Sequence, residues 1–234
     1  MRFPSVAGAT PDEIHQLSPR GGPHPRRPVR HARPRQQAGP DRRTVYIILA
    51  RHTREGAYQA AYGALKKRFP RWDDLLDAPR RVVEKLVYSG GLSSKKTLAL
   101  RAALRKLRQT FGRCTLEPAR AWSDEKLEEF LCTLPEIQRK SAYCIMMYSF
   151  GRQVFPADTH VGRVLSRLGP YRELGLSLEG RDHKKLQGDL ADLVPPNLRY
   201  GLHVNLVQHG QTMKTVWPRR YLRSKITSAQ SIPH

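Results

Sequence analysis

Residues 134–163 read LPEIQRKSAYCIMMYSFGRQVFPADTHVGR, and this stretch decides the fold. Pro135 is expected to end one helix, residues 136–139 make a tight connection, and Lys140 opens the next helix, whose apolar residues recur at helical spacing. The stretch is therefore predicted to form a helix, a hairpin and a second helix. Asp158 follows on a short loop at the start of another predicted helix, so that one lysine and one carboxylate are expected to reach the same cleft.

Lys140 and Asp158 are the candidate catalytic residues. A lysine amine becomes a nucleophile when burial or a helix N-terminus lowers its pKa, and the predicted position of Lys140 offers both conditions. A carboxylate such as Asp158 stabilises positive charge developing on a sugar ring or helps to move a proton. Each residue also has a simpler interpretation, because a lysine at a helix start is usually a solvated charge and an aspartate before Thr-His is usually an N-cap.

Apolar residues recur at helical spacing from Thr44 onward, whereas the alternation typical of strands is almost absent. Ser123 and the two acidic residues after it have the composition of a helix N-terminus. The predicted fold class is therefore all-α, with short loops between packed helices. The predicted helices cover about residues 58–69, 80–88, 100–111, 124–134, 140–150, 161–168, 183–193 and 198–209.

The chain is predicted to comprise four parts. Residues 1–43 contain eight of the 18 prolines and nine arginines against three acidic residues, which predicts a disordered basic arm. Residues 44–155 are expected to form a helical domain that ends in the helix-hairpin-helix, and residues 156–212 a second helical domain. Residues 213–234 form a basic tail with interleaved aromatic side chains.

Charge is the strongest constraint on the binding partner. The chain has 42 Lys and Arg against 20 Asp and Glu, a formal net charge of +22, and subtracting the arm's +6 leaves +16 on residues 44–234. A polyanion relieves such self-repulsion, and nucleic acid is the expected one. A membrane is the rival, but no stretch approaches the ~20 apolar residues of a spanning helix, and no apolar signal-peptide core follows Met1. We therefore expect a cytoplasmic, nucleoid-associated protein.

The two motifs of residues 134–163 resemble those of a known family. LPEIQRKSA, an 18-residue interval between lysine and aspartate, and ADTHVGRVLSRLG are similar to the endonuclease III family of the helix-hairpin-helix DNA glycosylase superfamily. Members carry a Leu-Pro-Gly-hydrophobic-Gly-x-Lys-[Ser/Thr]-Ala hairpin and a later Asp-Thr-His. The family's nucleophilic lysine therefore falls on Lys140 and its catalytic aspartate on Asp158. The likeness extends from about Val45 to about Gly210 and includes GGLSSKK and LHVNLVQHG.

The resemblance implies two helical domains that flank a DNA-binding cleft. The damaged base is expected to flip out of the duplex into a pocket. Lys140 then attacks C1′ of the sugar, releases the base and forms a Schiff base, after which β-elimination nicks the strand. His52 stands where relatives often have a glutamine that fills the hole left by the flipped base, and its ring is a candidate wedge.

Two further segments are expected to contact the DNA backbone. The hairpin of relatives binds a phosphate through its N–H groups, and Lys95 and Lys96 follow a Gly-Gly pair in a segment that can set a helix N-terminus on a phosphate. An ordinary turn between helices explains the second segment nearly as well. The residues expected to contact DNA are Glu136, Ile137, Gln138, Arg139, His52, Lys95 and Lys96.

The hairpin departs from the family pattern at both of its glycines. Glu136 and Gln138 occupy the positions that allow the backbone of relatives to turn sharply. A carboxylate repels a phosphate, so the DNA anchor is expected to be weakened unless Arg139 compensates.

The cysteines mark a second departure. Many relatives follow the LHVNLVQHG-like helix with four closely spaced cysteines that bind a four-iron, four-sulfur cluster. This chain has three cysteines, Cys114, Cys132 and Cys144, and none after Cys144. We therefore expect no iron-sulfur cluster, no other cofactor and no metal. The wide spacing argues against a disulfide framework, and the three thiols are interpreted as buried small residues.

The leading prediction is a base-excision-repair enzyme, a monomeric DNA glycosylase with apurinic/apyrimidinic lyase activity that acts on duplex DNA holding a damaged base or abasic site. Oxidised pyrimidines are the expected substrates. The presence of Lys140 favours this bifunctional reaction, because the related adenine glycosylases lack the lysine.

Three alternatives stay open. The missing hairpin glycines and cluster cysteines suggest a helix-hairpin-helix DNA-binding protein with weak or no catalysis. A monofunctional glycosylase for alkylated or mismatched bases is the second alternative. The third is a nucleoid protein held to DNA by charge alone, which predicts a steep salt dependence and no preference for damage.

Overall fold

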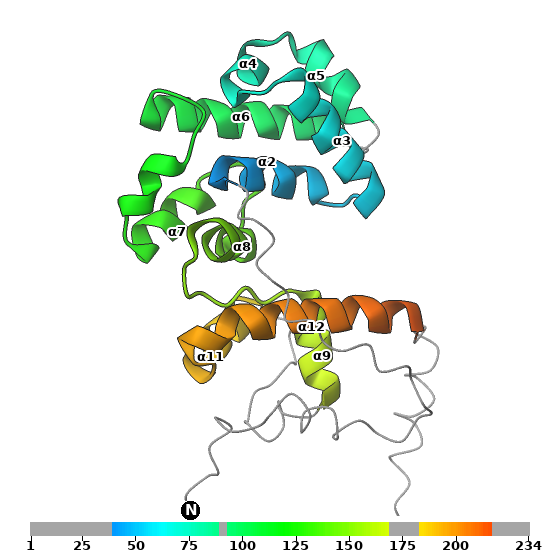
Figure 1. Ribbon diagram of the computed structural model, residues 1–234, viewed down its shortest axis with the longest axis vertical. Coiled ribbons are helices and arrows are strands. Elements are labelled where there is room, and N and C mark those ends of the chain that lie inside the picture. The colour runs from blue at the N-terminus through cyan, green and yellow to red at the C-terminus, as the bar shows by residue number, and fades with distance from the viewer. Residues whose placement is uncertain (1–38, 89–92, 169–182, 217–234) are drawn as a thin grey trace, which may run out of the picture. The chain divides into compact units, whose positions relative to one another are not determined.

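The computed structural model of the chain describes residues 39–88, 93–168 and 183–216 (Figure 1). Within these ranges every regular element is a helix and no strand occurs, so the predicted all-α fold is confirmed. The elements are α2 (Pro40–Ala50), α3 (Glu55–Arg68), α4 (Trp72–Asp77), α5 (Arg80–Val87), α6 (Ser93–Phe111), the 3-10 helix η3 (Glu117–Ala121), α7 (Asp124–Cys132), α8 (Arg139–Phe150), α9 (Thr159–Leu168), α11 (His183–Leu193) and α12 (Pro196–Val216).

Local sequence signals locate most of these helices. The Ser123 hydroxyl accepts a hydrogen bond from the backbone N–H of Lys126, which caps α7 as its composition predicts. The short elements were not predicted. α4 has six residues, and a helix of that length is too short to show a helical repeat, although its Trp72, Leu75 and Leu76 are buried.

The described residues belong to two compact units, each of which is described by itself. The larger unit contains residues 39–157, apart from 89–92, and residues 183–203. The smaller unit contains residues 158–168 and 204–216. The first domain was predicted to end at residue 155, two residues before this division, whereas residues 183–203 were expected in the second domain and here cluster with the larger unit.

Three stacked helices organise the larger unit. α2 lies between α6 and α8, and α4 and α5 pack on the far side of α6 (Figure 1). Leucines predominate among the largest fully buried side chains, and burying each one contributes roughly 1.5–3 kcal/mol. α8 is fixed to this core by Ala142, Ile145 and Met146, which are buried as predicted, and Phe150 is partly buried. The first turn of α8, which carries Lys140, therefore projects from a well-packed helix.

The start of α2 corrects the predicted extent of the basic arm. Residues 40–43 were assigned to the arm but form the first turn of this helix. Pro40 suits the first helical position, where an N–H has no intrahelical acceptor. The indole N–H of Trp72 donates to the Asp41 carboxylate at 3.0 Å, a contact over 31 residues that local composition does not reveal.

Other predictions fall on residues outside the described ranges. These are the arm over residues 1–38, the turn at Gly90 and Gly91, and the tail from Trp217 onward. Residues 213–216, which were assigned to the tail, continue α12.

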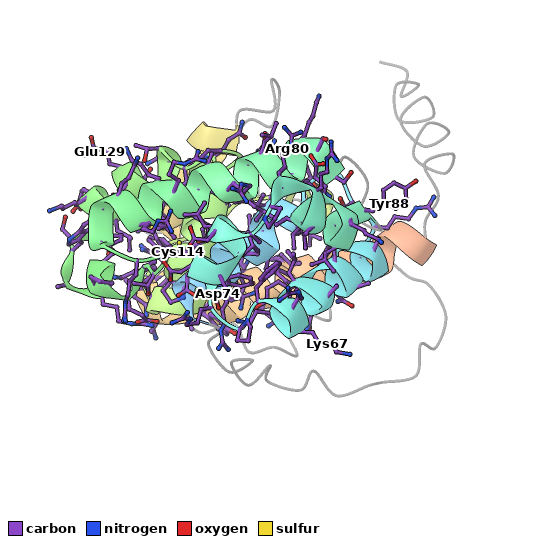
Figure 2. All side chains as sticks on the ribbon, turned by 90° about the horizontal axis from the view of Figure 1, so that it is seen from above. Lys67, Asp74, Arg80, Tyr88, Cys114 and Glu129 are labelled. Carbon is purple, nitrogen blue, oxygen red and sulfur yellow. The ribbon has the colours of Figure 1, made fainter. Side chains whose placement is uncertain are left out.

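The charged side chains of the larger unit lie mainly on its surface. Lys67, Arg80 and Glu129 project outward, and Tyr88, which is 78% exposed, extends past the end of α5 (Figure 2). Among the described residues, Lys96 is a buried exception at 5% exposure. None of the described helices has the length and apolar character needed to traverse a bilayer.

The smaller unit holds α9 close against α12. A Cβ added to Gly210 of α12 would lie 2.8 Å from the Cβ of His160 and 3.2 Å from its Cα. Real Cβ atoms do not approach that closely, so a glycine is needed at this crossing. The contact fixes the first turn of α9, where the Asp-Thr-His motif begins.

Candidate functional site

The hairpin before α8 has one left-handed residue. Glu136 has a φ of 66°, whereas Gln138, the N-cap of α8, is extended with φ −99° and ψ 170°. The N–H of Ile137 donates to the Leu134 carbonyl at 3.1 Å, and its side chain is buried in the core. Only the first of the two family glycine positions therefore requires an unusual backbone here, and Ile137 anchors the turn rather than offering its N–H to a phosphate.

Arg51 compensates for the carboxylate in the hairpin. Its Nη1 donates to the Glu136 carbonyl at 2.8 Å and pairs with Glu136 Oε2 at 3.1 Å. A left-handed residue with a side chain costs roughly 1–2 kcal/mol and persists where its surroundings hold it in place. The two contacts from Arg51 supply such a restraint and partly offset the negative charge of the Glu136 carboxylate.

Arg139, which was expected to play that compensating part, interacts elsewhere. Its Nε pairs with Glu128 Oε1 at 2.7 Å, and its Nη2 donates to the Tyr143 hydroxyl at 3.3 Å. The guanidinium is also 5.5 Å from the centre of the Tyr143 ring. Arg139 therefore joins the start of α8 to α7, and the cation beside Glu136 is Arg51.

Lys140 lies in the first turn of α8, and Asp158 lies at the N-terminus of α9. Lys140 is half-buried at the second position of α8. Asp158 Oδ1 accepts hydrogen bonds from the backbone N–H groups of His160 and Val161, each at 2.9 Å. Asp158 is thus the N-cap of α9, and the capped helix holds its carboxylate in a defined orientation. Lys140 belongs to the larger unit and Asp158 to the smaller one, and their meeting in one site stays a prediction.

His52 is exposed, and the residues on either side of it are held by hydrogen bonds. The residue has a φ of 52° and follows α2. Arg51 on one side is bound to the hairpin, and the Thr53 hydroxyl on the other donates to the Arg51 carbonyl at 2.9 Å. The wedge position inferred from the sequence is therefore accessible, and the loop that carries it has defined contacts.

The two lysines at the start of α6 differ in placement. Lys95 is exposed, as a phosphate contact requires. The buried ammonium of Lys96 instead donates to the Leu49 carbonyl at 2.7 Å and to the Thr53 hydroxyl. Burial lowers the pKa of Lys96. These contacts do not fit the predicted phosphate contact of Lys96, because its charge points into the protein and holds the His52 loop.

The larger unit thus gathers three predicted DNA-contacting segments into one cluster. Arg51 joins the His52 loop to the hairpin, and Lys96 joins the same loop to α6. Arg51 and Thr53 were missed by the sequence analysis. They directly flank His52 in the sequence, but a contact over 85 residues leaves no local signal.

No metal centre is apparent in the part of the chain that the structure describes, where no three His, Cys, Asp or Glu side chains are grouped suitably. The cysteines also do not fit a four-iron cluster, since there are three of them and none follows Cys144. Cys114 and Cys144 are buried as expected, whereas Cys132 is exposed in the last turn of α7, which corrects its assignment as a core residue.

A cavity of about 220 Å³ lies between α7, α8, α11 and α12. Three of its lining side chains are carboxylates, which does not suit it to nucleic acid. The lining residues are Asp124, Glu125, Glu128, Tyr143, Met146, Gln153, Val154, Ala191 and Arg199.

The comparisons with known proteins agree on one family of DNA repair proteins. Residues 45–196 match a family described as the HhH-GPD superfamily base excision DNA repair protein. The chain is 31% identical over 167 residues to a putative DNA glycosylase of Arabidopsis thaliana, an alignment that covers 71% of this chain and 55% of the relative. It is 26% identical over 170 residues to endonuclease III of Synechocystis sp., covering 72% of this chain and 70% of that protein. The chain therefore spans about half the length of the plant relative.

A solved structure shares the fold. The structure of a trapped covalent intermediate of endonuclease III with DNA matches with a TM-score of 0.63, covering 84% of this chain and 80% of that one. The sequences are 18% identical over the match, a level at which the likeness concerns the fold alone.

Proposed function

We propose, because the chain belongs to the HhH-GPD superfamily of base excision DNA repair proteins, that it is a DNA glycosylase with apurinic/apyrimidinic lyase activity. The observation that carries the proposal is the position of Lys140. It lies in the first turn of α8, directly after a hairpin whose Glu136 has a left-handed backbone. A lysine at the equivalent position is the nucleophile in the endonuclease III family that the sequence resembles.

The DNA backbone would be bound at the hairpin. The N-cap residue Gln138 makes no side-chain hydrogen bond to the first turn of α8. A helix N-terminus of this kind carries partial positive charge and attracts a phosphate. Exposed Lys95 adds a second contact, and Arg51 offsets the negative charge of Glu136.

The proposed reaction uses two residues, Lys140 and Asp158. The Lys140 amine forms a bond to C1′ of the damaged nucleotide while the glycosidic bond breaks and the base leaves with a proton. Opening of the sugar ring gives an imine, and transfer of a C2′ proton to water then breaks the C3′–O bond and expels the 3′ phosphate with its strand. Hydrolysis of the imine restores the amine. The Asp158 carboxylate stabilises the positive charge on the sugar and accepts a proton from the amine. Both capping hydrogen bonds reach Oδ1 and keep the carboxylate oriented.

Two measurements on one substrate panel test this function. The full chain is incubated with duplexes that each hold one damaged base, and base release and strand nicking are measured separately. The proposal expects both products on the same duplex, with oxidised pyrimidines preferred. Base release without nicking would instead indicate a monofunctional glycosylase.

A second candidate is a DNA-binding protein of the same fold with weak catalysis. The exposed carboxylate of Glu136 favours it, because a negative charge in the hairpin weakens phosphate binding. Selective binding of damaged duplexes without release of any base would support this candidate over the enzyme.

A further inference from the structure

The loop after α2 combines an exposed side chain with a strained backbone. His52 is exposed, yet its φ of 52° lies in the left-handed region that a residue with a Cβ occupies at a cost of roughly 1–2 kcal/mol. Strain of this kind persists where neighbouring contacts impose it, and it is concentrated at functional sites.

Two cations impose the conformation from opposite sides. Arg51, the residue before His52, is held at 2.8 Å by the Glu136 carbonyl and at 3.1 Å by its carboxylate. Thr53, the residue after it, is bound to the Lys96 ammonium. His52 is therefore the exposed residue between two anchored neighbours.

Lys96 also fastens the helix that leads into the loop. Its ammonium donates to the carbonyl of Leu49, in the last turn of α2, at 2.7 Å. The last carbonyls of a helix lack intrahelical donors and carry partial negative charge, so a cation stabilises them. Lys96 is 5% exposed, and burying a charge is costly unless it is paired and hydrogen-bonded. The Lys96 ammonium therefore holds the end of α2 and the loop after it, and it does not face solvent.

We propose that Lys96 is a positioning residue which, together with Arg51, holds exposed His52 in its left-handed conformation so that the imidazole is preorganised to enter DNA at a damaged site. The inference rests on the proposed function, because it takes His52 as the residue that fills the gap. Preorganisation strengthens binding by removing the entropic cost of ordering the loop on contact.

The test is the ratio of two dissociation constants of the full chain. One duplex holds a single tetrahydrofuran abasic analogue, which cannot form a Schiff base, and the other is undamaged. Lys96→Met removes the ammonium but keeps the stem, and His52→Ala removes the wedge. Each variant is expected to reduce the preference for the damaged duplex by about tenfold. The double variant is expected to lose no more than either single variant, since both act through one loop.

Lys95→Met is the matched control. Its exposed charge is one residue away, and its loss should weaken binding to both duplexes alike and leave the ratio unchanged. The proposal is overturned if Lys96→Met also weakens binding to both duplexes alike and leaves the ratio unchanged. It is equally overturned if the fold-losses in preference of the two single variants multiply in the double variant. It is also overturned if the wild type shows no preference or if His52→Ala keeps it.

A second variant covers the case in which Lys96→Met does not fold. Thr53→Val removes the hydroxyl that Lys96 binds and leaves the lysine in place, and its folding can be checked by thermal melting. We expect a loss of preference of about threefold that disappears in the His52→Ala background. An unchanged ratio in Thr53→Val overturns the proposal. Base release is not part of this measurement, so failure of the glycosylase proposal and failure of the positioning proposal give different results.

Discussion

Arg51 donates a hydrogen bond to the Glu136 carbonyl at 2.8 Å and pairs with the Glu136 carboxylate at 3.1 Å, which joins two loops 85 residues apart in the chain. Both loops contain a left-handed residue other than glycine, His52 in one and Glu136 in the other. The hairpin tolerates a glutamate at position 136 because Arg51, at the end of α2, binds both its carbonyl and its carboxylate.

Removal of the Glu136 carboxylate should strengthen binding to DNA. Glu136→Gly removes the negative charge beside the hairpin and relieves a left-handed strain of roughly 1 kcal/mol, while losing a half-exposed ion pair worth about 0–1 kcal/mol. We expect little change in the free energy of unfolding and tighter binding to undamaged duplex, measured by fluorescence anisotropy at fixed salt.

Glu136→Gln distinguishes the effect of the charge from the effect of backbone strain in the same assay. It keeps the strained residue but removes the charge, so it should also bind DNA more tightly than the wild type. Weaker or equal binding by both variants would mean that no phosphate approaches this hairpin.

Substitution of Asp158 should distinguish its capping role from its proposed catalytic role. Asparagine caps helices as well as aspartate does, so Asp158→Asn should keep the melting temperature and reduce base release and nicking by about 100-fold or more. Asp158→Ala should lose the activity and also about 1 kcal/mol of stability, because the N–H groups of His160 and Val161 lose their acceptor. Full activity in Asp158→Asn would show that the carboxylate only caps α9.

The glycine at the α9–α12 crossing should be required for activity. Gly210→Ala places a Cβ 2.8 Å from the Cβ of His160, so α9 must shift, at a cost of roughly 1–3 kcal/mol, and its N-terminal Asp158 moves with it. We expect a lower melting temperature and a lower kcat. Gly201→Ala on the same helix meets nothing within 4 Å and should raise stability by up to about 1 kcal/mol. Equal melting temperatures for the two variants would contradict the close packing.

The three thiols should differ in reactivity. Burial raises the pKa of Cys114 to about 12, so almost none of it is thiolate at pH 8, whereas Cys132 is exposed. Brief treatment of the folded protein with iodoacetamide, followed by peptide mass spectrometry, should show labelling of Cys132 before Cys114. In guanidinium chloride all three cysteines should react, and equal labelling of the folded protein would argue against the described core.

The features that the sequence predicted correctly are those that arise from local chemistry. The Ser123 cap and the start of α8 next to Lys140 follow from residue types at fixed short spacings. The family follows from two motifs whose positions along the chain can be read directly. The capping role of Asp158 was also foreseen as the simpler interpretation of that residue.

The features that the sequence missed depend on residues that are distant in the chain. The burial of Lys96 needs the end of α2 and Thr53, which lie more than 40 residues earlier. The start of α2 is also held by Trp72, whose indole N–H binds the Asp41 carboxylate. The exposure of Cys132 depends on which face of α7 packs against the core. Residue type alone specifies none of these partners.

The central claim is that the Lys140 amine attacks the sugar, and borohydride trapping tests it most directly. The full chain is incubated with an abasic-site duplex and sodium borohydride, which reduces a Schiff base to a stable covalent bond, and the product is resolved on a denaturing gel. Exposed Lys95 offers the matched control. We predict a covalent adduct for the wild type and Lys95→Ala, with the attachment mapped to Lys140 by mass spectrometry, and no adduct for Lys140→Ala that still binds the duplex. An adduct of undiminished yield in Lys140→Ala, or no adduct in the wild type, would contradict the claim.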